Sequence, residues 1–134
     1  MVTPAMDAMP RDLVRVLTVD DYAPFLGMAR GMVAATSGFV SAGEVGSGSD
    51  ACNAIDRDEP ELVLIDIRMP GMDGIAVSDW IRRFHPSVVV VLITADDLST
   101  LPAAAFRCGA AAVVRKQDLR PSLLTQLWRA HGPD

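Results

Sequence analysis

Residues 62–74 read Leu-Val-Leu-Ile-Asp-Ile-Arg-Met-Pro-Gly-Met-Asp-Gly, and they decide the fold. The aliphatic run at the start is typical of a strand that is covered on both faces of a parallel sheet. The run leads into Asp66, and Pro70-Gly71 then suits the two central positions of a type II turn. Asp73 is a candidate N-cap for a following helix. The stretch therefore predicts a buried strand, a turn and a helix around one carboxylate.

Aliphatic runs recur on both sides of this stretch, at residues 13–19, 39–45, 88–94 and 111–114. Segments of helical length separate the runs. Strands that alternate with helices predict an α/β fold with right-handed crossovers. We expect a doubly wound parallel sheet of five strands between two helix layers, which is a three-layer sandwich.

Three of the separating segments carry an apolar stripe at helical spacing. The stripes comprise Phe25, Met28, Ala29, Met32 and Val33, then Val77, Trp80, Ile81 and Phe84, and then Leu119, Leu123, Leu127 and His131. Asp118 is a candidate N-cap for the last helix. The helical pattern at residues 49–57 is weaker. Residues 98–108 predict a short helix, because Pro102 fits only near a helix start.

The chain has 134 residues, and its twelve Lys and Arg against seventeen Asp and Glu give a formal charge of −5. This length fits one domain, which we place at residues 13–131, with a flexible tail at 1–12 and a connector at 132–134. The acidic balance argues against direct nucleic-acid binding. The longest aliphatic run is far shorter than the roughly 20 residues of a membrane span. Two isolated cysteines, Cys52 and Cys108, predict reduced core thiols in a cytoplasmic protein.

Reactive side chains follow four of the five predicted strands, and they are Asp20-Asp21, Asp66, Thr94 and Lys116. Ligands of open α/β sheets bind beyond the carboxyl ends of the strands. If the strand order is 2-1-3-4-5, these four ends are contiguous. Three crowded carboxylates repel one another unless a cation lies among them, and Mg²⁺ is the simplest candidate. With Lys116 and Thr94 opposite, the cluster resembles a cradle for a phosphoryl group.

These residues, together with the loop at 69–74 and Thr94-Ala95, resemble the receiver domain of two-component response regulators over about residues 13 to 131. The resemblance implies a flavodoxin-like fold, and the strand order 2-1-3-4-5 comes partly from it. It implies that Asp66 is the phosphoacceptor, which takes a phosphoryl group from a phosphohistidine. It also implies a Mg²⁺ site formed by the side chains of Asp20, Asp21 and Asp66 and the backbone carbonyl of Arg68.

The resemblance further implies that Lys116 and Thr94 bind phosphoryl oxygens and that the small Ala95 leaves the acceptor open. Two features depart from the family. Val113 stands where the family usually has an aromatic switch residue, which predicts a muted or differently routed switch, because a β-branched side chain has little reach. Gln117 replaces a frequent Pro, as in the subfamily with a helix-turn-helix output domain, and predicts a trans peptide bond.

Arg68 and Asp96 each stand two residues beyond a site residue, at positions that tune hydrolysis of the phosphoryl group in this family. Their opposite charges predict either a pair that impedes an attacking water or two solvated side chains. Both readings stay open, since exposed pairs contribute only ~0 to 1 kcal/mol.

The expected partners are a histidine kinase or a phosphotransfer protein, and a second copy through the face made by the fourth helix, fifth strand and fifth helix. We expect no catalysis beyond the domain's own phosphorylation and dephosphorylation. An aspartate-nucleophile phosphatase needs a second Asp where this chain has Arg68. A flavodoxin-like carrier needs a phosphate loop where it has Asp20-Asp21. A degenerate receiver, which acts as an interaction module without phosphorylation, remains the main alternative.

Overall fold

The computed structural model describes residues 13–133, so the tail predicted at residues 1–12 and the last connector residue lie outside the described residues. Five parallel strands form one sheet in the order β2-β1-β3-β4-β5. The strands are β1 (Val14–Val19), β2 (Phe39–Val45), β3 (Leu62–Asp66), β4 (Val89–Thr94) and β5 (Ala112–Arg115). This confirms the predicted doubly wound, flavodoxin-like arrangement.

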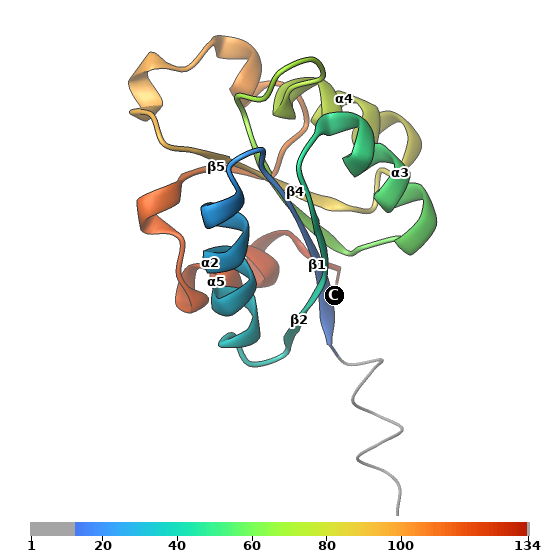
Figure 1. Cartoon of the computed structure of the whole chain (residues 1–134), viewed down its shortest axis with the longest axis vertical. Helices are drawn as coiled ribbons and strands as arrows, with labels where there is room; N and C mark the ends of the chain where they lie inside the picture. Colours follow the sequence, from blue (N-terminus) through green and yellow to red (C-terminus); the bar gives the residue numbers. More distant parts are fainter. Residues whose placement is uncertain (1–12, 134) are drawn as a thin grey trace, which may run out of the picture.

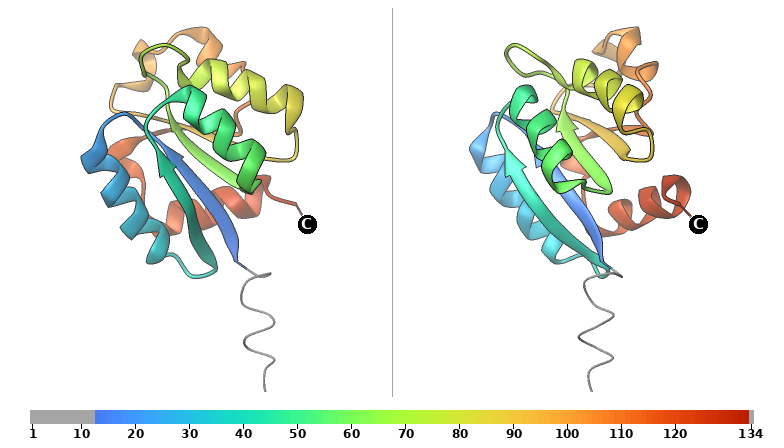
Figure 2. Two further views of the ribbon diagram at one scale, coloured as in Figure 1. Left: turned by 45° about the vertical axis from the view of Figure 1, so that its right-hand side comes forward. Right: turned by 90° about the vertical axis from the view of Figure 1, so that its right-hand side faces the viewer.

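Helices cover both faces of the sheet (Figures 1 and 2). Helices α2 (Ala23–Ala34) and α5 (Pro121–His131) pack on one face, and α3 (Gly48–Asp58) and α4 (Gly74–Phe84) pack on the other. In β3, Leu62 and Leu64 belong to the first core while Val63 and Ile65 belong to the second. Because each buried aliphatic side chain contributes about 1.5 to 3 kcal/mol, β3 holds the two layers together.

The connection between β4 and β5 contains two 3₁₀ turns, η1 (Leu98–Thr100) and η2 (Ala103–Phe106), and no α-helix among its residues, all of which the structure describes. Pro102 lies directly before η2, as its N-cap. The prediction of a short helix over residues 98–108 was therefore wrong in type, because two 3₁₀ turns stand in its place. The remaining 3₁₀ turn, η3 (Lys116–Asp118), follows β5.

Asp118 does not cap the last helix, so that prediction was wrong. It lies inside η3, and Arg120 occupies the N-cap of α5 without a side-chain hydrogen bond. Pro121 sets the start of α5, because its fixed φ and missing N–H suit the first helical position. The peptide before Gln117 is trans, as are all peptide bonds in the described residues.

Three members of the predicted stripes do not face the core. Met28 is 47% exposed and Phe84 57% exposed, and His131 is exposed as well. Phe84 and His131 are the last residues of their helices. The Phe84 ring lies against Trp80, with ring centroids 5.7 Å apart. Both cysteines are free, but only Cys108 is fully buried. None of the helices in residues 13–133 combines the length and apolar content that a membrane crossing requires.

Candidate functional site

Three carboxylates meet at the carboxyl edge of the sheet. Val19 of β1 pairs with Ile65 of β3, so the residues that follow them, Asp20 and Asp66, lie side by side. One carboxylate oxygen from each of Asp20, Asp21 and Asp66 lies within 4.8 Å of the other two. Parallel strand register therefore brings together the acids predicted from the sequence.

The two acids at the strand ends are buried, and the third is exposed. Asp20 has 0% relative exposure and Asp66 has 7%, whereas Asp21 is open to solvent. The pKa of Asp66 is raised from 3.8 to about 6, mainly by burial and also by the Asp20 and Asp21 charges, while Lys116 opposes the rise. The site thus holds more negative charge than its single ammonium group offsets, which favours a bound cation.

Lys116 lies across from these acids, on η3. Its Nζ atom lies 2.5 Å from Oδ2 of Asp20 and 3.6 Å from Oδ1 of Asp66. The same ammonium group lies over the Phe25 ring, 4.5 Å from the ring centroid. The sequence showed Phe25 only as a member of an apolar helix stripe. Its contact with Lys116 joins α2 to η3 and had no sequence signal.

Thr94 ends β4 next to the acids and is buried. Its Oγ1 atom accepts a hydrogen bond from the backbone N–H of Asp96, at 3.0 Å. Ala95, between them, is exposed. Val113 lies on β5, where it is partly buried and packs against the core beneath α3 and α4.

Arg68 and Asp96 form the pair that the sequence suggested. Nε of Arg68 donates to Oδ2 of Asp96 at 2.5 Å, and the two side chains are 62% and 40% exposed. The pair joins the loop after β3 to the segment after β4. Its geometry favours the paired interpretation over two separately solvated side chains, while its role in hydrolysis stays a prediction.

The loop after Asp66 has the predicted features. Gly71 takes a φ of 73°, which suits the third position of a type II turn, and the Asp73 carboxylate caps α4 by accepting the N–H of Ala76 at 2.9 Å. The sequence did not reveal the role of Gly74. A Cβ atom there would collide with the backbone carbonyl of Asp66, so only Gly allows α4 to start directly against the acceptor strand.

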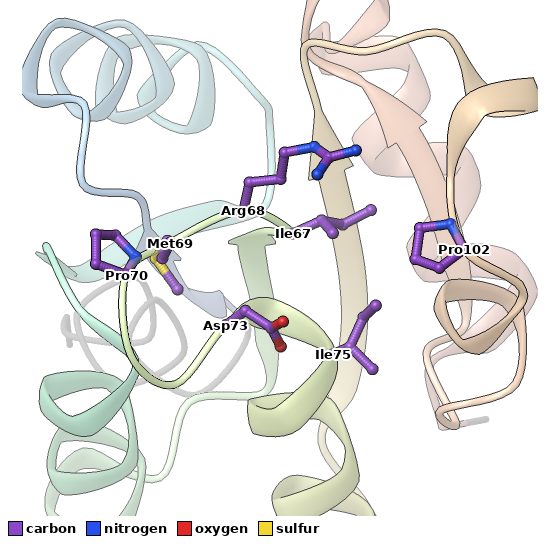
Figure 3. Close-up of a pocket in the computed structure, with 7 residues that line it drawn as sticks. All are labelled: Ile67, Arg68, Met69, Pro70, Asp73, Ile75 and Pro102. Carbon is purple, nitrogen blue, oxygen red and sulfur yellow. The ribbon is translucent and has the colours of Figure 1, made fainter.

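A hollow of about 430 Å³ lies beside the site (Figure 3). The loop after β3 forms one side, and Pro102, from the segment between η1 and η2, forms the other. The side chain of Arg68 extends from the loop toward the end of β4 in this view. The hollow is lined by Ile67, Arg68, Met69, Pro70, Asp73, Ile75 and Pro102.

The donor set fits a hard divalent cation. Carboxylate oxygens are the ligands that Mg²⁺ takes in proteins, and it keeps several waters when only one or two carboxylates bind it directly. Because Asp21 is exposed, a cation can reach the three carboxylates from solvent. The site therefore places a set of carboxylates that fits a cation next to an ammonium group and a hydroxyl group, which are groups able to donate hydrogen bonds to an anion.

Comparison with known proteins agrees with this geometry. The response regulator receiver domain family matches residues 16–127. Response regulator GacA of Pseudomonas viridiflava is 30% identical over 104 residues, which cover 78% of this chain and 49% of that protein. The probable transcriptional regulatory protein NarL of Mycobacterium tuberculosis H37Rv is 34% identical over 113 residues, which cover 83% of this chain and 51% of that protein.

A solved structure of the signal receiver domain of Mycobacterium tuberculosis NarL superposes with a TM-score of 0.81 at 28% identity. The superposition covers 90% of this chain and 97% of that one. The chain spans about half the length of the two curated relatives above. On its fold, its sequence match and the arrangement of its strand ends, the chain belongs to the response regulator receiver domain family of two-component systems.

Proposed function

We propose that Asp66 is the phosphoacceptor of this receiver domain. The observation that carries the proposal is the position of Asp66 at the end of β3, buried between Asp20 and Lys116. A carboxylate oxygen of Asp66 attacks the phosphorus of a donor phosphohistidine, the P–N bond breaks, and the imidazole keeps the electron pair. The product is an acyl phosphate on Asp66.

Asp20, Asp21 and Asp66 would hold Mg²⁺, with the backbone carbonyl of Arg68 as a further ligand. When bound, this ion would offset the charge on the transferring group. Lys116 binds one phosphoryl oxygen by a charge-assisted hydrogen bond, and the Thr94 hydroxyl donates to another. Ala95 has too small a side chain to obstruct the donor.

The Arg68–Asp96 pair is proposed to slow hydrolysis of the acyl phosphate. It joins two loops beside Asp66, at 2.5 Å between Nε and Oδ2. A pair in that position restricts the approach of water. This predicts a phosphoform that lives longer than one without the pair.

The proposed partner is a histidine kinase or a phosphotransfer protein, which would act on this domain in the cytoplasm. A second copy is proposed to bind at the face formed by η1, η2, β5 and α5. This is the face expected from the sequence, with η1 and η2 in the place of its fourth helix. A hollow of about 440 Å³ on that face, lined in part by Leu98, Val113 and Leu123, supports this choice.

The domain is proposed to comprise residues 13–131, with residues 132–134 beginning a connector to an output domain. The chain matches about half of GacA and of a probable transcriptional regulatory protein, which supports transcription regulation by a longer protein. We propose further that Val113 does not pass the signal through the usual aromatic route. A Val113→Tyr variant whose response to phosphorylation matches wild type would contradict this last point.

The decisive experiment incubates the protein with Mg²⁺ and acetyl phosphate and measures its intact mass. We expect the mass of one added phosphoryl group, its loss when a chelator removes Mg²⁺, and no addition to Asp66→Asn. Asp118→Asn is the matched control and should be modified like wild type. If wild type is not modified, or if Asp66→Asn is modified equally, the degenerate receiver becomes the better interpretation.

A further inference from the structure

The segment between β4 and β5 is weakly held. Of its residues 95–107, only Ala105 is buried, and its regular structure consists of the short η1 and η2. Segments with few buried apolar side chains open locally at lower free-energy cost than the core elements. This segment is therefore the part of the domain that a change at the acceptor can move most easily.

Asp96 ties the start of this segment to the site in two directions. Its backbone N–H donates to Thr94 Oγ1 at 3.0 Å, and its carboxylate accepts from Arg68 Nε at 2.5 Å. The next residue, Asp97, caps η1 by accepting the N–H of Ser99 at 3.0 Å. A displacement of Asp96 is thus passed directly to η1.

There is room for such a displacement. Across the hollow shown in Figure 3, Pro102 faces Ile67 and Ile75 without packing closely against the loop. The Arg68–Asp96 pair bridges the same two segments at one end of this space. Loss of the pair removes a direct link between them.

A phosphoryl group on Asp66 disturbs both contacts of Asp96. The group carries about −2 charge, so it attracts the Arg68 guanidinium and repels the Asp96 carboxylate. The Thr94 hydroxyl turns toward a phosphoryl oxygen in order to donate to it, and this weakens the hydrogen bond that Thr94 Oγ1 accepts from the Asp96 N–H. Both changes loosen the hold on Asp96.

We propose that Asp96 is the switch residue of this domain: phosphorylation draws Arg68 and the Thr94 hydroxyl toward the phosphoryl group, which weakens both contacts of Asp96 and so frees residues 97–106 in a larger share of molecules. The share that keeps the Arg68–Asp96 pair is the one in which the pair slows hydrolysis. The proposal rests on Asp66 as the phosphoacceptor. It supplies a route that does not need an aromatic side chain at position 113. Because the pair is exposed, breaking it shifts the equilibrium by no more than about fivefold.

The test is hydrogen exchange by mass spectrometry on peptides that cover residues 95–107. Mg²⁺ with beryllofluoride serves as the phosphoryl mimic. In wild type, we expect beryllofluoride to speed exchange of these peptides by roughly two- to fivefold, because an exposed ion pair contributes only a small free energy. Asp96→Ala should exchange faster than wild type before beryllofluoride is added, and should respond less to it.

A charge-exchanged double variant, Arg68→Asp with Asp96→Arg, restores a pair and should regain slow exchange without beryllofluoride. Val113→Ala is the control for the route through β5, and its response should match that of wild type. Asp96→Ala tests the carboxylate contact even if Asp66 is not phosphorylated, because its comparison with wild type needs no ligand.

Two results would overturn the switch while leaving the phosphoacceptor in place. One is phosphorylated Asp66, seen by intact mass, with exchange of residues 95–107 unchanged or slower under beryllofluoride. The other is Asp96→Ala with the exchange rates of wild type in the ligand-free state. Failure of phosphorylation itself would contradict the proposed function instead.

Discussion

The Nζ atom of Lys116 lies 2.5 Å from Oδ2 of Asp20, a carboxylate with no exposed surface. The lysine side chain is itself only 19% exposed. Removal of one partner of a buried pair leaves an uncompensated charge in a poorly solvated place. This relationship makes Lys116 a structural residue as well as a proposed phosphoryl ligand.

Lys116→Met should lower the free energy of unfolding by about 3 kcal/mol when Mg²⁺ is absent. The loss should shrink when Mg²⁺ is added, because a bound cation replaces the missing positive charge near Asp20. Urea unfolding with a chelator and then with excess Mg²⁺ measures both values. Arg129→Met is the control, since that exposed residue of α5 should change stability by less than about 0.5 kcal/mol. Equal losses in the two variants would count against the buried pair.

The raised pKa of Asp66 predicts that replacing its carboxylate by a neutral group increases the free energy of unfolding, by an amount that depends on pH. Burial and the neighbouring acids raise this pKa from 3.8 to about 6 against the effect of Lys116, so the folded protein holds the proton more tightly than the unfolded chain does. Stability from this group is complete below about pH 4 and is lost as the pH rises through about 6. Asp66→Asn avoids that loss. Without Mg²⁺, it should be more stable than wild type by up to about 3 kcal/mol at neutral pH.

Urea unfolding of both proteins across about pH 4 to 8 checks this expectation. The difference between Asp66→Asn and wild type should be near zero at the acid end and should grow toward neutral pH. Asp118→Asn, which changes a carboxylate that is not one of the three clustered acids, should show no such growth. A difference that stays constant with pH would show that the carboxylate does not titrate as its burial requires.

The site could be predicted because its chemistry follows directly after the strands. An aliphatic run marks a buried parallel strand, and parallel strands deliver their next residues to one edge. The positions of Asp20, Asp66 and Thr94 at this edge could be predicted from these two rules alone. The strand order 2-1-3-4-5 came partly from the family resemblance, because contiguous reactive ends agree with this order but do not select it alone.

Features that depend on packing between distant segments were not predictable in the same way. The contact of Phe25 with Lys116 joins α2 to the end of β5, and nothing in either local sequence indicates it. Met28, Phe84 and His131 keep helical spacing with core residues but are exposed, and spacing alone does not show this. Asp118 had the right residue type for a cap, but Pro121 sets the helix start three residues later.

Asp96→Ala should shorten the lifetime of the phosphoform. The Arg68–Asp96 pair lies beside the proposed acceptor, and its removal opens a path for water. An exposed pair contributes at most about 1 kcal/mol, so the half-life should fall by no more than about fivefold. Intact mass over time, after acetyl phosphate is removed, measures the decay. Asp118→Ala is the control, and its phosphoform should decay at the wild-type rate. Equal half-lives for Asp96→Ala and wild type would show that the Arg68–Asp96 pair does not affect hydrolysis.

Gly74→Ala should disturb the acceptor through the backbone. The added Cβ atom would meet the carbonyl of Asp66, which belongs to a buried strand and cannot move away cheaply. We expect a loss of about 1 to 3 kcal/mol in the free energy of unfolding and slower phosphorylation of Asp66. Gly27→Ala is the matched control, because its Cβ atom would meet nothing within 4 Å on helix α2.

The two glycine variants should move stability in opposite directions. Ala is favoured over Gly in a helix interior by up to about 1 kcal/mol, so Gly27→Ala should be neutral or stabilising and should be phosphorylated at the wild-type rate. Urea unfolding and the intact-mass assay on the same preparations separate the two effects. If Gly74→Ala were as stable and as reactive as Gly27→Ala, the close packing of α4 against the acceptor strand would have no weight in positioning Asp66.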